Sequence, residues 1–388
     1  MIVQRYVVMS MINPFKFGKA VSGDEFYDRK DSFRKLYSKL SGGSCNVVMY
    51  APRRYGKTSL VKKVLAKLSE EGVPTICFNL NKIETIEKFC EQYTAAICSL
   101  VGKGRETANL LVEYLSHLHP TVSIGGESLV SVRFDYGAKM SSDSLSNVLD
   151  FANRIATEKL ERRIVIAFDE FQEIERLSPT LPLEGIFRGC MQEHENVGYV
   201  FFGSKTHLLK RMFGDRSRPF YKSAATMRLE RPPKDESEAY VCRRFAARNI
   251  GIDASTAARI VYEAENVPYY IQQLGALTYE SVLAREGDWV EKSDVDAAID
   301  DLLAENGDYY GERFLALSPT QRVLLSALAH EPKKEFTGDY RTRHGLGASS
   351  TVHAALKILI ENGLVESDEG QYHLGDPFFS RFIRSRPW

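Results

Sequence analysis

Residues 50–63, YAPRRYGKTSLVKK, constrain the fold more than any other stretch of the chain. The apolar run 44–50 before them has the pattern of a buried strand, and the residues after Gly56 carry apolar side chains at helical spacing. A loop between such a strand and helix can wrap its backbone N–H groups around a phosphate at the helix N-terminus. Lys57 would then reach the β- and γ-phosphates, and the hydroxyl of Thr58 would hold Mg²⁺. The stretch therefore predicts a phosphate-binding loop made of Pro52, Arg53, Arg54, Tyr55, Gly56, Lys57, Thr58 and Ser59.

Ala51 stands where the phosphate-loop pattern has its first glycine. A glycine is needed there only if the backbone φ is positive. Because Pro52 follows, we expect Ala51 to be extended, and Gly56, at the closest approach to the phosphate, is retained. We therefore expect the loop to bind nucleotide. The alternative is a strand-to-helix turn that contains Gly-Lys-Thr by chance, and the strand and helix on either side argue against it.

Strand and helix patterns alternate after the loop. Buried-strand patterns recur at 73–80, 162–170 and 197–204, and residues 121–136 alternate around a Gly-Gly pair as a β-hairpin does. The helical patterns lie at about 57–71, 85–101, 143–160 and 183–193. This order predicts an α/β fold, a P-loop NTPase three-layer core with a largely parallel sheet.

The pattern changes after the prolines at 232–233. The following residues are wholly helical, and the last part of the chain has three helical stretches and then two short strands around a turn. That last order is typical of a winged helix-turn-helix. We therefore expect three domains: the α/β core over 1–233, an all-α domain over 234–311 and a winged helix-turn-helix over 312–388.

Acidic and polar residues end two of the predicted strands. Asp169 and Glu170 follow a buried run, and Ser204 ends the strand after it. At the carboxyl end of a parallel sheet, Asp169 can hold Mg²⁺ and Glu170 can act as general base on the attacking water. Ser204 can reach the γ-phosphate or that water, or cap the next helix. The alternative is that the two acids simply end a strand in solvent, and the phosphate loop earlier in the chain favours the catalytic interpretation.

Several arginines could stabilise charge in the transition state. They are Arg53, Arg54, Arg211, Arg216 and Arg218. An arginine supplied by a second copy of the chain would imply self-association. We interpret most of them as solvated surface residues and take Arg218 as the best candidate.

Composition excludes some function classes. The formal net charge is zero, so nucleic acid or an anionic membrane would have to bind through a local patch. The six cysteines are scattered without metal-ligand spacing, which indicates a reducing compartment and no disulfide framework. No stretch approaches the roughly 18 apolar residues of a membrane helix, and the N-terminus lacks a secretory signal pattern. We expect a cytoplasmic protein without a membrane partner.

With these motifs in place, the chain resembles the archaeal-type AAA ATPases, in the STAND branch of P-loop NTPases. The resemblance covers nearly the whole length and rests on NPFKFGKAVSGDEFYDRKD, APRRYGKTSL, IAFDEFQEI, FFGS, NVPYYIQQLG and the C-terminal LGASSTVHAALKILIENGLVE with YHLGDPFFSRFI. It implies an ATPase core, a helical lid and a C-terminal winged helix.

The resemblance also implies roles for single residues. Lys57, Thr58, Asp169, Glu170 and Ser204 match the nucleotide motifs of the family. Residues implied to lie near the adenine are Asn13, Pro14, Phe15, Tyr27, Asp28 and Arg29. The lid motif, usually Gly-x-Pro with the proline near the base, is here Asn266-Val267-Pro268. Asparagine tolerates a left-handed conformation, so we expect the turn to persist.

A winged helix commonly lays one helix in the DNA major groove. The matching helix would run from about Ala348 to Glu361, with Arg341 and Arg343 just before it. Residues 312–388 contain ten Lys/Arg and nine Asp/Glu, a weak basic balance for a DNA-binding module. Docking on the rest of the chain or on a protein partner is the alternative.

We expect an ATPase that binds ATP and Mg²⁺, hydrolyses ATP slowly and acts as a nucleotide-dependent switch between ATP and ADP states. Slow turnover is expected because the sequence shows no clearly placed arginine finger. Two alternatives stay open. One is a DNA-binding protein whose winged helix depends on ATP, and the other is a nucleotide-binding scaffold that does not hydrolyse.

Overall fold

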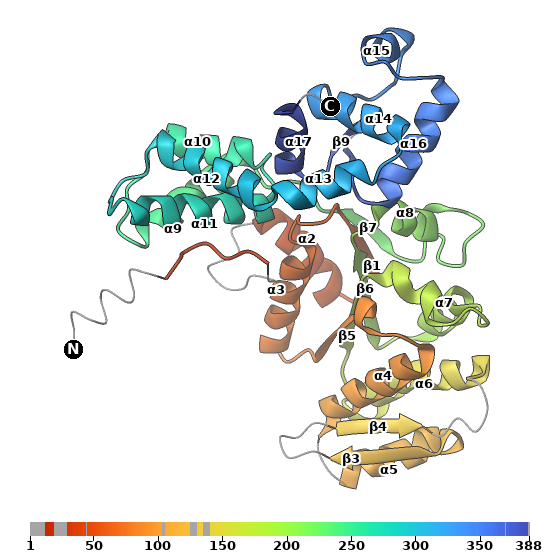
Figure 1. The fold of residues 1–388 in the computed structure, drawn as a ribbon. Coiled ribbons are helices and arrows are strands. Elements are labelled where there is room, and N and C mark those ends of the chain that lie inside the picture. Colours follow the sequence, from red (N-terminus) through yellow and green to blue (C-terminus); the bar gives the residue numbers. More distant parts are fainter. Residues whose placement is uncertain are drawn as a thin grey trace. The chain divides into compact units, whose positions relative to one another are not determined.

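The structure, a computed structural model, describes residues 12–18, 29–43, 45–102, 105–124, 130–134, 140–368 and 370–386 (Figure 1). It divides into two compact units. The α/β unit comprises residues 29–51 and 57–229, and the helical unit comprises residues 52–56 and 230–388 with the N-terminal segment. The phosphate-binding loop thus groups with the helical unit, and the strand and helix that flank it group with the α/β unit.

The α/β unit is built on a five-stranded sheet. In spatial order its strands are β2 (Thr75–Asn79), β5 (Ile164–Asp169), β6 (Val197–Gly203), β1 (Val47–Tyr50) and β7 (Ala225–Arg228). Every neighbouring pair is parallel. Parallel strands need crossover connections, and helices supply them here. The predicted α/β fold with a largely parallel sheet is confirmed.

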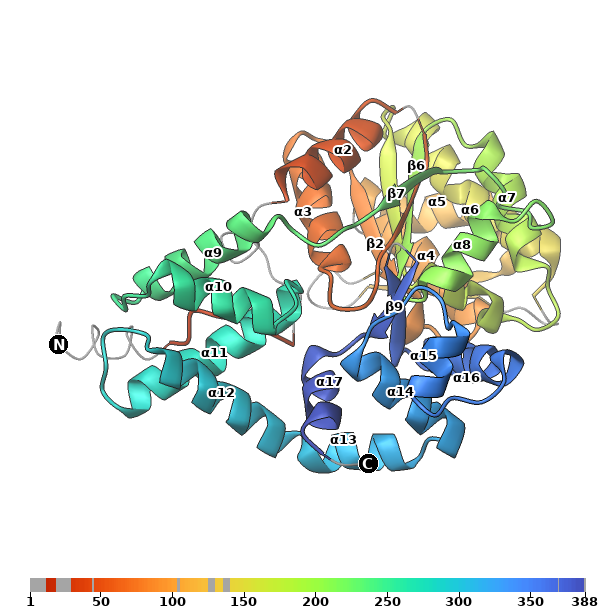
Figure 2. The ribbon, with the colours of Figure 1, turned by 90° about the horizontal axis from the view of Figure 1, so that it is seen from above.

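Helices cover both faces of the sheet, which makes the three layers (Figure 2). One face carries α2 (Lys30–Ser41) and α3 (Lys57–Glu70). The other carries α4 (Ile86–Val101), α6 (Ser142–Arg154), α7 (Leu183–Glu193) and α8 (Thr206–Gly214). All six residues of β5 are buried, as expected for a strand covered on both faces.

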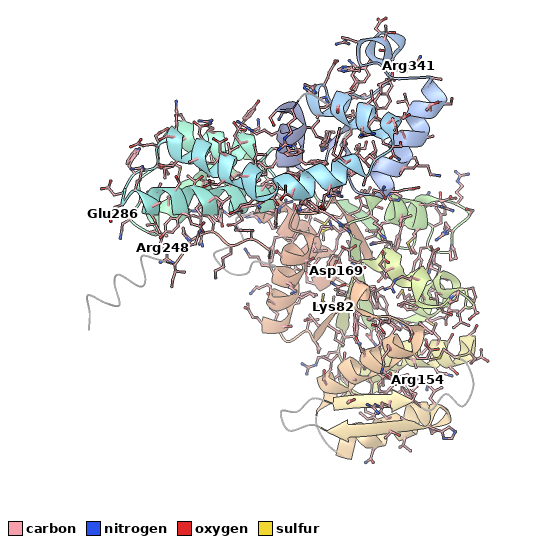
Figure 3. The ribbon with its side chains drawn as sticks, in the orientation of Figure 1. Lys82, Arg154, Asp169, Arg248, Glu286 and Arg341 are labelled. Carbon is pink, nitrogen blue, oxygen red and sulfur yellow. The ribbon has the colours of Figure 1, made fainter. Side chains whose placement is uncertain are left out.

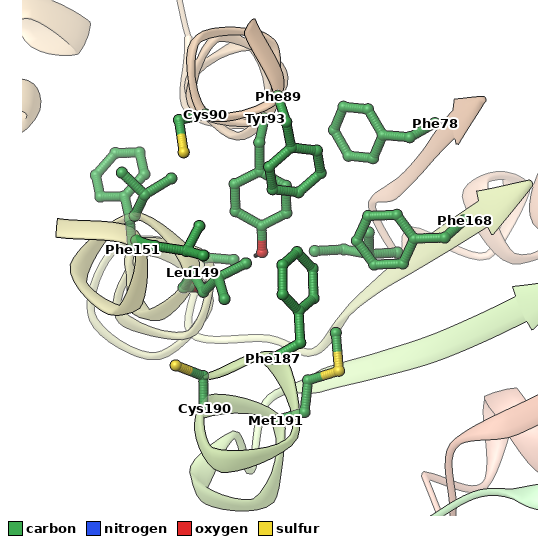
Figure 4. Close-up of a cluster of buried hydrophobic side chains, with 14 of the residues drawn as sticks. Phe78, Phe89, Cys90, Tyr93, Leu149, Phe151, Phe168, Phe187, Cys190 and Met191 are labelled. Atoms are coloured by element: carbon green, nitrogen blue, oxygen red, sulfur yellow. Dashed lines mark hydrogen bonds between the residues drawn. The ribbon is translucent and has the colours of Figure 1, made fainter. Parts of the chain in front are cut away.

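An aromatic cluster fixes β5 against the helices (Figure 4). The ring of Phe168 stacks on Phe78 of β2 with centroids 5.7 Å apart and lies close to Phe89 of α4. Phe187 of α7 completes this side of the cluster. Each fully buried ring contributes about 1.5–3 kcal/mol relative to exposure. The cluster holds the residue before Asp169 and so positions the end of β5.

An insertion between α4 and α6 carries the predicted hairpin. It contains α5 (Arg105–Leu115), a short 3₁₀ turn η3 (Ser116–Leu118) and the antiparallel strands β3 (Pro120–Ile124) and β4 (Val130–Phe134). The Gly-Gly turn predicted for this hairpin lies outside the described residues. Shorter segments link the remaining elements: η2 (Leu80–Lys82), η4 (Ile155–Lys159) and η5 (Phe171–Leu177).

The helical unit begins with a five-helix lid. Its helices are α9 (Lys234–Ala246), α10 (Ala254–Glu263), α11 (Pro268–Ala284), α12 (Lys292–Glu305) and α13 (Gly307–Leu315). The N-terminal segment packs into this lid through Phe15, which is 3% exposed and lies 5.0 Å from Phe245 between ring centroids. A Cβ at Gly275 would lie 2.6 Å from the Phe15 ring, so glycine is required for this approach. Tyr27 and Asp28 lie outside the described residues.

The winged helix follows the lid. Its elements are α14 (Pro319–His330), α15 (Gly338–Arg343), α16 (Ser349–Glu361), the antiparallel pair β8 (Val365–Asp368) and β9 (Gln371–Leu374), and α17 (Pro377–Arg384). The predicted order of three helices and a two-stranded wing is confirmed. The C-terminal helix α17 packs on the same unit, with the ring of Phe379 stacked on Tyr310 at 5.1 Å.

Among the described residues, no helix combines the length and apolar character needed to cross a membrane.

Candidate nucleotide-binding site

The site lies at the carboxyl edge of the sheet. β1 pairs in parallel with β6, and β6 pairs in parallel with β5, so these three strands end at the same edge. The phosphate-binding loop follows β1, Asp169 ends β5, and Ser204 follows β6. Figure 3 labels Asp169 in this part of the α/β unit. Ligands of open α/β sheets bind at this edge.

Lys57 is the first residue of α3 and is only 6% exposed. Its Nζ donates to the carbonyl oxygen of Ala51 at 2.7 Å, which places the ammonium group against the start of the loop. Ala51 is buried and is not among the described residues with a positive φ. The backbone there does not require glycine, as expected from the proline that follows. Thr58 and Ser59 come next on α3.

Thr58 and Asp169 are in direct contact. The hydroxyl Oγ1 of Thr58 donates to Oδ2 of Asp169 at 2.9 Å. Burial raises the pKa of Asp169 to about 6 and the neighbouring charge of Glu170 adds to the rise, although the Thr58 hydrogen bond opposes it. A buried carboxylate with an adjacent hydroxyl is an oxygen donor set of the kind that Mg²⁺ prefers. These two side chains therefore fit the predicted magnesium site.

Glu170 is oriented by its neighbours. Its backbone φ of 54° is left-handed, which is uncommon for a residue other than glycine. Its Oε2 accepts hydrogen bonds from the backbone N and the Oγ of Ser204, both at 3.0 Å. The same oxygen accepts from Nε2 of Gln172 at 2.6 Å. The structure thus brings Glu170 and Ser204 together, and α8 begins two residues after Ser204 with Lys205 in the cap position.

Gln172 is a site residue that the sequence prediction missed. It lies in η5, directly after β5, and is 5% exposed. A Cβ at Gly203 would lie 2.1 Å from Oε1 of Gln172, so glycine leaves room for the amide in this position. One indication of this role is present in the sequence: Gln172 is a polar residue two positions after Glu170.

The loop itself has two left-handed residues. Arg54 has φ 69° and Gly56 has φ 83°. Such turns point successive N–H groups to one side and form concavities that bind anions. Tyr55 is buried and accepts a hydrogen bond from Nε of Arg231 at 3.0 Å. Pro52 is partly buried and Arg53 is exposed.

The predicted lid motif reaches the loop within the helical unit. Pro268 is the first residue of α11, and the backbone N of Tyr269 donates to the carbonyl oxygen of Arg54 at 3.4 Å. Asn266 has φ 55°, the left-handed conformation expected for the residue that replaces glycine. Its side chain bonds Ser237 Oγ at 2.6 Å and the carbonyl oxygen of Pro232 at 2.7 Å.

Arg218, the favoured arginine-finger candidate, is paired within the α/β unit. Its guanidinium donates through Nε to Glu184 at 3.1 Å and also bonds Glu175. Burial and the neighbouring Glu175 raise the pKa of Glu184 to about 7, although the arginine opposes the rise. In this arrangement Arg218 holds the segment after α8 to α7.

Known proteins were compared with the chain and its structure. The family model "Probable winged helix domain" matches residues 308–385. A Walker-type ATPase of Pyrococcus abyssi has a similar structure, with a TM-score of 0.65, 18% identity, and coverage of 96% of this chain and 99% of that one. The ORC2 protein of Aeropyrum pernix, solved with ADPNP and ADP, is similar with a TM-score of 0.55, 15% identity, and 92% coverage of each chain. No curated protein matches the sequence.

Fold and site together define the class: the chain has a P-loop ATPase fold that ends in a winged helix. The resemblance to archaeal ATPases noted in the sequence is confirmed at the level of the fold, over almost the full length of the Pyrococcus protein.

Proposed function

We propose that the chain binds ATP with Mg²⁺ at the carboxyl edge of its sheet, hydrolyses ATP slowly and acts as a STAND-type nucleotide switch. The observation that supports this most directly is the hydrogen bond between Thr58 and Asp169, with Lys57 one residue away. Thr58 lies in the first turn of α3, after β1, and Asp169 ends β5. A Gly-Lys-Thr turn that occurred by chance would not be expected to contact a buried aspartate.

Each residue has a role that its surroundings allow. Lys57 neutralises phosphate charge, and the backbone N–H groups of residues 53–59 hold the phosphate oxygens. Thr58 and Asp169 would hold Mg²⁺, which when bound supplies charge neutralisation for the phosphates. Glu170 accepts the proton of the attacking water, and Ser204 positions the Glu170 carboxylate.

Two features support slow turnover. Three donors already surround Oε2 of Glu170, so a water must share this oxygen or use the other one. Arg218 is engaged by two glutamates rather than directed to the site. We expect turnover by the isolated chain well below about 1 s⁻¹, the low end of ordinary enzymes.

The test is phosphate release by the parent and by Glu170→Gln. The variant keeps the size of the side chain and one acceptor oxygen for Ser204 and Gln172 but removes its basicity. We expect ATP affinity to stay within about threefold and phosphate release to fall about 100-fold or more. A matched control is Glu193→Gln, an exposed glutamate on α7. Equal release by parent and Glu170→Gln would instead favour the non-hydrolysing scaffold.

DNA binding stays a second candidate because α16 exposes a polar face. Its exposed residues include Ser349, Ser350, Thr351, His353 and Lys357. Arg343, however, pairs with Glu331 at 2.8 Å, which reduces the basic charge beside that face. A salt-dependent duplex shift assay with and without ATP tests this candidate, since Lys357→Ala should weaken binding only if α16 contacts phosphates.

A further inference from the structure

Arg54, in the middle of the phosphate-binding loop, is bound by the lid and the winged helix. Its Nη1 donates to Oδ2 of Asp376 at 3.1 Å and to the hydroxyl of Tyr270. The guanidinium also lies over the rings of Tyr269 and Tyr270, 4.8 Å from each centroid. Cations held over aromatic faces are attracted by the rings, and Arg is the usual partner. One loop side chain therefore joins the start of α11 to Asp376, the residue just before α17.

The partners of Arg54 are themselves fixed. Tyr270 is 1% exposed and its hydroxyl donates to the carbonyl oxygen of Gly375 at 3.2 Å. The hydroxyl of Tyr310 donates to Oδ2 of Asp376 at 3.5 Å. Burial raises the pKa of Tyr270 and of Tyr310, so both hydroxyls stay protonated. Rigid partners of this kind restrict where the guanidinium can lie.

Asp376 has a second role in the winged helix. Its Oδ1 accepts from the backbone N of Phe378 at 3.0 Å and of Phe379 at 3.2 Å, and so caps α17. Its two oxygens thus divide between the cap and Arg54. Asp376 therefore connects the loop to the first turn of α17.

The left-handed backbone of Arg54 relates its contact with Asp376 to phosphate binding. A left-handed φ at arginine is unfavourable and persists only when its surroundings hold it. The hydrogen bond from Tyr269 N to Arg54 O and the contacts of the guanidinium supply that support. The left-handed turn in turn helps to direct the loop N–H groups toward an anion.

We propose that Asp376 of the winged helix is a positioning residue for the phosphate-binding loop, acting through Arg54. The inference rests on the proposed function. Docking of α17 and binding of the nucleotide phosphates are then coupled, and by linkage each strengthens the other. The coupling gives the winged helix a direct influence on nucleotide affinity, and it gives the nucleotide an influence on the winged helix.

The test is the affinity of Asp376→Asn for Mg·ATP and Mg·ADP. Asparagine retains an oxygen to cap α17 but removes the charge that holds Arg54. We expect the Kd to rise about five- to tenfold, the lower range of allosteric couplings. Arg54→Ala should show a similar rise in Kd. The Kd of the double variant should not exceed that of the single variant with the higher Kd, because both changes remove the same contact.

The matched control is Arg381→Gln. Arg381 of α17 pairs with Glu263 of the lid at 2.6 Å, so this variant also breaks a contact between lid and winged helix but does not touch the loop. Its nucleotide Kd should equal that of the parent. Equal weakening by Arg381→Gln and Asp376→Asn would overturn the proposal, because general loosening would then explain both.

A second readout is amide hydrogen exchange in residues 377–384. Mg·ADP should slow this exchange in the parent and have a smaller effect in Asp376→Asn. If the parent binds nucleotide and Asp376→Asn matches it in Kd and exchange, the inference fails and the proposed function stands. If the parent binds no nucleotide, both are wrong.

Discussion

At the scale of single residues, the candidate site depends on how closely neighbouring groups pack. Gly203 leaves room for the amide of Gln172, and Gln172 in turn donates to Glu170. Ala51, by contrast, tolerates its Cβ because its backbone is not left-handed. The sequence motifs predict Lys57, Thr58, Asp169 and Glu170 as site residues. They could not identify Gln172, because the contact depends on how η5 turns after β5.

Gly203→Ala is expected to impair hydrolysis more than binding. The added Cβ would lie 2.1 Å from Oε1 of Gln172 and 3.3 Å from the Cα of Glu170, so Gln172 must move and Glu170 loses a donor. We expect phosphate release to fall about 10- to 100-fold, because small displacements of catalytic groups slow reactions by such factors. The Kd for ATP should change little. Gly214→Ala, where a Cβ meets nothing within 4 Å, is the control. Parental phosphate release by Gly203→Ala would contradict the role of Gln172.

At the scale of elements, periodicity predicted the central strands and their helices because these segments are buried on one or both faces. The edge strand β7 was not predicted, since its residues ATMR are mostly not buried and show no apolar run. A short edge strand with little buried surface gives a weak sequence signal. The helix α2 was also missed, although Phe33, Leu36, Tyr37 and Leu40 stand at helical spacing.

The contact between α7 and the segment after α8 predicts a pH dependence. Glu184 has a pKa of about 7 in the folded chain, above its ordinary 4.5. Between these values the folded chain binds more protons than the unfolded chain, so the stability from this group falls as pH rises toward 7. Relative to Glu184→Gln, the parent should therefore lose unfolding free energy from pH 5 to pH 7.5.

Urea unfolding of both proteins at several pH values measures this difference. Glu193→Gln, an exposed change on the same helix, should show no such pH dependence. A difference between parent and Glu184→Gln that stays constant with pH would mean that Arg218 keeps Glu184 ionised throughout.

At the scale of the whole molecule, the chain combines an ATPase fold with a winged helix, and both were predictable from the order of patterns. The contact of Arg54 with Asp376 was not, because 322 residues separate them in sequence and neither carries a motif that names the other. Domain limits at 233 and 311 stay a prediction. In the structure, residues 52–56 group with the lid and winged helix.

The most direct test of the account is nucleotide titration of the parent and of Lys57→Ala. The variant lacks the Lys57 ammonium group, so the phosphates lose one charge-assisted hydrogen bond. We therefore expect the Kd for Mg·ATP to rise about 10- to 100-fold. The thermal midpoint should change little. Lys62→Ala, an exposed lysine on the same helix, should bind as the parent does. If Lys57→Ala binds ATP as tightly as the parent, the nucleotide site does not lie at this loop.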